Sequence, residues 1–156
     1  MLAQKDWTLP AGQEYPDLCA KQQLTRDIYV SAIRPVHPRG THHTFVALSD
    51  TNDGERCTSA VTRGTLIYAA GVGSEGLTLP EGVGLKLPAG KFLNLSLHLY
   101  NATTEELRGT SGIEMIEMAP SEVVYESSTL LAGPVSLQIP PGRTCLLYTS
   151  PSPRDS

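Results

Sequence analysis

The stretch Phe92–Tyr100, FLNLSLHLY, decides the fold class of this chain. Leucine occupies every second position from Leu93 to Leu99, and Asn, Ser, His and Tyr occupy the alternate positions. Because neighbouring side chains of a strand point to opposite faces, this alternation predicts a β-strand with one apolar and one polar face. We expect the leucine face in the core, so His98, on the opposite face, should project to solvent or into a cleft.

Segments of the same kind recur along the chain. They are short, rich in Val, Ile, Leu and Tyr, and separated by turn residues, as in β-sandwiches and jelly rolls. The segments predicted as strands are Asp27–Val36, Thr44–Leu48, Leu66–Ala70, Gly82–Leu87, Phe92–Tyr100, Gly112–Met118 and Val135–Ile139. The sequence therefore predicts an all-β, single-domain protein, an antiparallel β-sandwich of the jelly-roll kind.

An aliphatic-Pro-x-Gly motif occurs between these segments. Proline is expected at the first corner of each turn, where it fixes φ, and glycine is expected to close the turn. The four copies are Leu9–Gly12, Leu79–Gly82, Leu87–Gly90 and Ile139–Gly142.

Composition excludes some classes of partner. The chain has 156 residues, with 12 basic and 16 acidic side chains and a formal net charge of −4. Because no basic stripe is available to neutralise phosphates, nucleic acid is not expected as a partner. No apolar run is long enough to span a membrane, so no membrane span is predicted.

The end of the chain does not resemble a folded element. The run Cys145–Asp155, CLLYTSPSPRD, resembles over its whole length the translation of a transposon-type sequencing adaptor. An ordinary Ser/Pro-rich tail is the alternative. We therefore interpret the chain as a truncated open reading frame whose native sequence ends near Thr144, with one domain at residues 1–144 and a non-native tail at 145–156.

Setting the tail aside leaves two cysteines, Cys19 and Cys57. They flank the segment that contains two adjacent histidines, and in an oxidising compartment they could form a disulfide. Two buried thiols in a cytosolic protein are the alternative.

Three of the four histidines are candidate metal ligands. His42 and His43 stand at the head of the apolar strand Thr44–Leu48, and His98 lies on the polar face of another strand. Imidazole suits copper and zinc. Adjacent strand residues point to opposite faces, so both can reach one metal only if the backbone twists or bulges, or if the pair lies at the strand's end. Two surface histidines at a turn are the alternative.

The order of these residues resembles the copper type II, ascorbate-dependent monooxygenases, the group of peptidylglycine α-hydroxylating monooxygenase and dopamine β-monooxygenase. The resemblance is to the N-terminal of their two jelly-roll domains and runs from about Tyr15 to Thr144. The pieces that carry it are His42-His43, Cys57, Ile67-Tyr68-Ala69, Leu79-Pro80-Glu81-Gly82-Val83-Gly84 and Leu97-His98-Leu99-Tyr100.

The resemblance implies a function for this set. His42, His43 and His98 would bind one copper ion, which stores and passes an electron and is reduced by ascorbate. In the family, a C-terminal domain holds a second copper through a His-x-His pair and a methionine. That copper activates dioxygen and hydroxylates an aliphatic C–H bond of a small-molecule or peptide substrate. No His-x-His occurs in this chain, so no catalytic residue is assigned to it, and the isolated chain should be inactive without its catalytic domain.

The resemblance also implies a Cys19–Cys57 disulfide and an extracytoplasmic location, whether secreted, periplasmic or lipid-anchored. His37 has no counterpart in the family and is expected at the surface. Met115 and Met118 are interpreted as core side chains of a strand, not as thioether ligands.

Two other functions remain open. The same three histidines could form a zinc site of a hydrolase-like protein, which needs a nearby acid or base. The sequence places no carboxylate next to the histidines, since Asp50 is the nearest to the pair. The chain could also be a jelly-roll binding or interaction module without chemistry.

Overall fold

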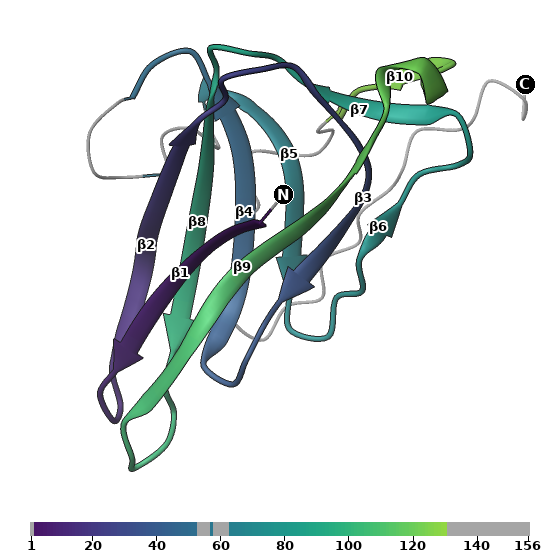
Figure 1. The fold of residues 1–156 in the computed structure, drawn as a ribbon. Coiled ribbons are helices and arrows are strands. Elements are labelled where there is room, and N and C mark those ends of the chain that lie inside the picture. Colours follow the sequence, from purple (N-terminus) through teal and green to yellow (C-terminus); the bar gives the residue numbers. More distant parts are fainter. Residues whose placement is uncertain (1, 53–56, 58–62, 131–156) are drawn as a thin grey trace, which may run out of the picture.

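A computed structural model of the chain describes residues 2–52, 57 and 63–130. Over these residues the protein consists of two β-sheets packed against each other (Figure 1), and a single 3-10 turn, η1 (Pro120–Glu122), precedes the last strand. The prediction of an all-β, single-domain sandwich is confirmed. In the part of the chain that the structure describes, no helix is long and apolar enough to cross a membrane.

The two sheets differ in size. The six-stranded sheet has the order β1-β9-β3-β7-β10, with β6 paired to β3 at its side, and the four-stranded sheet has the order β2-β8-β4-β5. Described pairings are antiparallel except that of β10 with β7, which is parallel. The strands are β1 (Leu2–Leu9), β2 (Glu14–Gln23), β3 (Ile28–Val36), β4 (Thr41–Ser49), β5 (Thr65–Gly71), β6 (Leu77–Thr78), β7 (Val83–Leu87), β8 (Phe92–Tyr100), β9 (Leu107–Met118) and β10 (Tyr125–Ser127).

The core lies between the sheets. The four leucines of β8 are each at most 1% exposed and belong to one cluster with apolar side chains of β3 and β9, which confirms that the leucine face is buried. Each fully buried side chain of this size contributes about 1.5–3 kcal/mol through the hydrophobic effect. Met115 is a core residue, as predicted, whereas Met118 is only half-buried.

The predicted strand Phe92–Tyr100 has the predicted bounds. Other predicted strands are confirmed with changed ends: Thr44–Leu48 lengthens to Thr41–Ser49, so the adjacent histidines lie inside β4 instead of ahead of it. The predicted strand Val135–Ile139, the turn Ile139–Gly142 and the tail at 145–156 lie outside the described residues.

Strands β1 and β2 were not predicted from the sequence. Only about half of the residues in each strand are apolar. In the described part of the chain both strands lie at sheet edges and pair on one side only, β1 with β9 and β2 with β8. Their alternation is weak because few of their side chains enter the core; in β1 these include Trp7 and Leu9. Trp7 Nε1 also donates a hydrogen bond to Ser111 Oγ over 2.7 Å, which ties β1 to β9. Backbone pairing and a few buried anchors therefore define these strands.

Two of the Pro-x-Gly motifs, Leu9–Gly12 and Leu79–Gly82, form hydrogen-bonded turns, but their prolines sit one position earlier than expected. Pro10 O accepts a hydrogen bond from Gln13 N, and Pro80 O accepts one from Val83 N, so proline opens each turn. Gly12 and Gly82 then occupy the third position with φ of 66° and 73°, a conformation that glycine adopts without steric cost.

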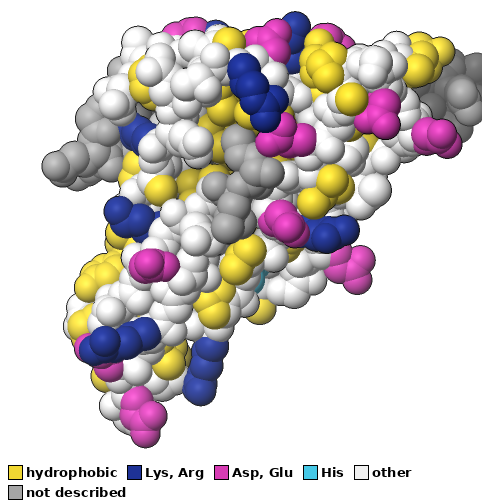
Figure 2. All heavy atoms as spheres, viewed as in Figure 1, with side chains coloured by type: hydrophobic (Ala, Val, Ile, Leu, Met, Phe, Trp, Pro, Cys, Tyr) yellow, Lys and Arg dark blue, Asp and Glu magenta, His cyan; other side chains and the backbone are white. Residues whose placement is uncertain are grey.

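The predicted Cys19–Cys57 disulfide is present, with a Cα–Cα distance of 5.3 Å. It joins β2 to the connection between β4 and β5. On the face shown in Figure 2, basic and acidic side chains are interspersed.

Candidate metal centre

A β-bulge brings the adjacent histidines to one place. In the pairing of β4 with β8, Thr41 opposes Leu99 and His43 opposes His98, so β4 advances by two residues while β8 advances by one. The extra residue is His42. A bulge places two residues of one strand opposite one residue of its partner, which lets both neighbours approach the same side chain. Two adjacent histidines can share one metal only where the backbone is irregular, and this bulge is such an irregularity.

The three rings meet through the same type of nitrogen. His43 Nδ1 lies 3.0 Å from His42 Nδ1 and 3.2 Å from His98 Nδ1. The ring centroids are 4.5–5.2 Å apart and the rings are steeply inclined to one another. One nitrogen of each histidine lies within 4.8 Å of the other two.

These separations fit a small ion. Metal–imidazole bonds of about 2.0–2.1 Å place two ligand nitrogens of a tetrahedral site roughly 3.3–3.4 Å apart. The two measured Nδ1 separations, 3.0 and 3.2 Å, are close to that value. In the third pair, His42 and His98, one ligand nitrogen of each residue lies within 4.8 Å of the other, and the His42 side chain is exposed. The donor set is therefore compatible with one ion held on three sides and open on the fourth.

His43 is the central residue of this cluster. It is half-buried, and its ring packs against that of Phe45 at 4.8 Å. Burial, and secondarily the neighbouring His98 and His42, lower the pKa of His43 below the ordinary value of 6.5. A lowered pKa favours the neutral imidazole, which is the form that binds a metal.

A carboxylate lies beside the cluster. Glu14 Oε1 is 2.5 Å from His98 Nε2, the ring nitrogen remote from the other two histidines. The expectation that no carboxylate is adjacent to the histidines is therefore wrong. Glu14 was missed because it lies 84 residues from His98 in sequence, on a strand that the hydrophobic pattern did not reveal.

His37 does not belong to the cluster. It is half-buried, not at the surface as expected, and its Nε2 lies 2.9 Å from Thr44 Oγ1. Burial lowers its pKa.

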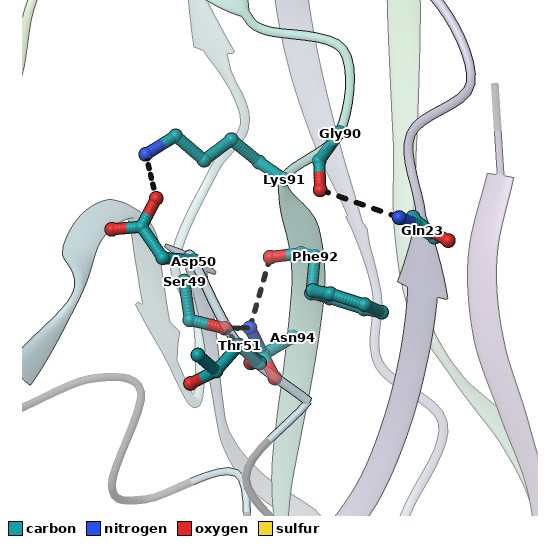
Figure 3. A network of polar contacts seen from close by, with 8 residues as sticks. All are labelled: Gln23, Ser49, Asp50, Thr51, Gly90, Lys91, Phe92 and Asn94. Carbon is teal, nitrogen blue, oxygen red and sulfur yellow. Dashed lines mark hydrogen bonds and ion pairs between the residues drawn. The ribbon is translucent and has the colours of Figure 1, made fainter.

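The polar face of β8 is accessible only near the histidines. Asn94 and Ser96, on the same face of β8 as His98, are almost fully buried. Asn94 Nδ2 donates hydrogen bonds to Ser49 Oγ and to the Phe92 carbonyl, beside the ion pair of Lys91 with Asp50 (Figure 3). Backbone and side-chain partners thus occupy this end of the face, while His98 keeps 16% of its side chain exposed.

No protein-family model matches this chain, and no curated protein matches it at a significant level.

Proposed function

We propose that this chain is the electron-transfer copper domain of a copper type II, ascorbate-dependent monooxygenase, with His42, His43 and His98 as the copper ligands. The observation that carries the proposal is that His43 Nδ1 lies 3.0 Å from His42 Nδ1 and 3.2 Å from His98 Nδ1, at a bulge in β4. Three neutral imidazoles suit copper in either oxidation state.

The three proposed ligands differ in how exposed they are. His43 and His98 are half-buried and directly opposed across two paired strands, so their positions are fixed by the sheet. His42 is exposed and is the ligand nearest to solvent. When bound, copper supplies a one-electron store that ascorbate can fill from the solvent side. A rigid ligand set keeps the reorganisation that accompanies electron transfer small.

The substrate chemistry belongs to a second domain. We expect the electron to pass to a catalytic copper in a C-terminal domain of the same protein, where a small-molecule or peptide substrate is hydroxylated. The Cys19–Cys57 disulfide supports a secreted, periplasmic or lipid-anchored protein, because disulfides persist in oxidising compartments.

Zinc is the main alternative ion, since it accepts the same ligands. A zinc hydrolase also needs a general base near the metal-bound water. Glu14 is the nearby carboxylate, but it contacts the His98 nitrogen that faces away from the cluster, so it is poorly placed for that role. This position of Glu14 argues against a hydrolytic zinc site.

Metal titration of the full chain tests the proposal. Cys145 is replaced by serine, because a free thiol binds Cu(I), and the protein is produced in an oxidising compartment. We expect near one-to-one copper binding, and loss of the Cu(II) electron-paramagnetic-resonance signal when ascorbate is added. His43→Ala and His98→Ala should lose this binding, whereas His37→Ala, outside the cluster, should retain it.

Three results would contradict the proposal. The first is a parent protein that binds no copper. The second is copper binding that survives in both His43→Ala and His98→Ala, and the third is a bound Cu(II) that ascorbate does not reduce. Retention of zinc alone would favour the alternative site, and binding of neither ion would favour an interaction module.

A further inference from the structure

The short contact between Glu14 and His98 has a defined origin in the sheet. Glu14 opposes Tyr100 in the pairing of β2 with β8, and Tyr100 and His98 lie on the same face of β8 two residues apart. Glu14 is therefore a diagonal neighbour of His98, within reach of a long side chain. Its Oε1 lies 2.5 Å from His98 Nε2.

This contact constrains the state of the His98 ring. A neutral imidazole carries one N–H, and a carboxylate only accepts hydrogen bonds, so the contact places the hydrogen on Nε2. The Nδ1 lone pair is then free to face His43. Rotating the ring by half a turn would break the bond to Glu14 and replace Nδ1 by a carbon atom. The Glu14 contact thus fixes both the tautomer and the orientation of His98.

The three histidines are not equivalent in this respect. Over residues 2–52, 57 and 63–130, His98 has a carboxylate on its Nε2, whereas no hydrogen bond is found at the Nε2 of His42 or His43. A hydrogen bond from a metal-binding imidazole to a carboxylate orients the ring and makes it a stronger electron donor.

We propose that Glu14 is a positioning residue of the metal centre: it holds His98 with Nδ1 toward the ion and makes His98 the strongest donor of the three ligands. The inference rests on the proposed function insofar as it assumes that the histidines bind copper. Because a negative charge beside a ligand favours the more positive ion, Glu14 also lowers the reduction potential of the bound copper.

A graded series of variants tests this role. Glu14→Ala removes both the hydrogen bond and the charge, and Glu14→Gln removes the charge but keeps an oxygen that can accept from Nε2. Asp17→Asn is the matched control: Asp17 is also a carboxylate of β2, but it accepts a hydrogen bond from Ser96 Oγ over 2.7 Å. Thermal unfolding of each variant verifies that the sheet is intact.

Copper affinity and reduction potential are the first readouts. We expect copper affinity to fall roughly 10–100-fold in Glu14→Ala, the usual effect of losing such a partner, and less in Glu14→Gln. The reduction potential should rise in both variants and change little in Asp17→Asn. Equal affinity and potential in Glu14→Ala and Asp17→Asn would overturn the role of Glu14, even if the parent protein binds copper as proposed.

The metal-free protein gives a second, independent readout. Nitrogen NMR of the histidine side chains at mildly alkaline pH should show His98 with its hydrogen on Nε2 in the parent protein, and a mixture of tautomers in Glu14→Ala. A parent His98 with its hydrogen on Nδ1 would overturn the inference without any metal. Failure of copper binding in the parent protein, in contrast, would refute the proposed function and leave the tautomer result to decide whether Glu14 holds the ring.

Discussion

His43 and His98 face each other across β4 and β8, with their Nδ1 atoms 3.2 Å apart, because the two residues are direct partners in the strand register. Figure 1 shows these two strands side by side in the middle of the four-stranded sheet. The pair is thus as rigid as the sheet, whereas His42 owes its place to the bulge and is exposed. This difference leads to unequal expectations for the three ligands.

His98→Ala should weaken copper binding more than His42→Ala. His98 is already held by the sheet and by Glu14, while ordering the exposed His42 side chain on binding costs conformational entropy that reduces its net contribution. We expect His98→Ala to lose more than the roughly 10–100-fold that removal of a supporting partner costs. Competition titration with a copper chelator measures both variants. Equal affinities would contradict this order by showing equal contributions, and the reverse order would show that the bulged residue is the principal ligand.

The disulfide should stabilise the fold strongly. Cys19 and Cys57 close a loop with a sequence separation of 38, for which restriction of the unfolded chain predicts about 3–4 kcal/mol. Cys19→Ser together with Cys57→Ser should lower the free energy of unfolding by that amount in denaturant titrations. Reducing the parent protein with a thiol provides the control, since it should give the same loss. A change below about 1 kcal/mol would mean that the reduced chain keeps the same constraint by other contacts.

Leu97→Ala should create a costly cavity. Leu97 is fully buried between the sheets, and large-to-small changes at such sites cost about 2–5 kcal/mol. The matched control is Leu77→Ala at 39% exposure, for which a much smaller loss of unfolding free energy is expected. Similar losses in the two variants would contradict the placement of the leucine face in the core.

The stability of the metal-free protein should fall as the pH decreases through the range just below 6.5. Burial lowers the pKa of His37 in the folded state, so below pH 6.5 the unfolded chain takes up a proton that the folded chain does not. The free energy of unfolding keeps falling until the pH reaches the pKa of His37 in the folded state. Below that pH, His37 causes no further change. Unfolding midpoints measured above and below pH 6.5 should drop less in His37→Gln than in the parent protein. An identical pH dependence in both proteins would show that His37 does not contribute.

Much of the fold could be predicted from local sequence. The leucines of Phe92–Tyr100 alternate because one face of β8 is buried, and this signal gave the bounds of the strand. The edge strands β1 and β2 escaped prediction because they bury few side chains and are held by pairing with β9 and β8. Because β9 and β8 are distant from β1 and β2 in the sequence, no local sequence pattern indicates these pairings.

The candidate site could also be predicted only in part from the sequence. The sequence by itself determined that His42 and His43 are adjacent, that His98 lies on the polar face of a strand, and that two cysteines flank the histidine pair. Only the tertiary structure decided that His42 is a bulged residue, that His43 opposes His98, and that Glu14 reaches His98 from an edge strand. The physical reason is that side-chain direction follows the two-residue period of a strand, which is local. Register and strand order, in contrast, depend on hydrogen bonds and packing between segments far apart in the chain.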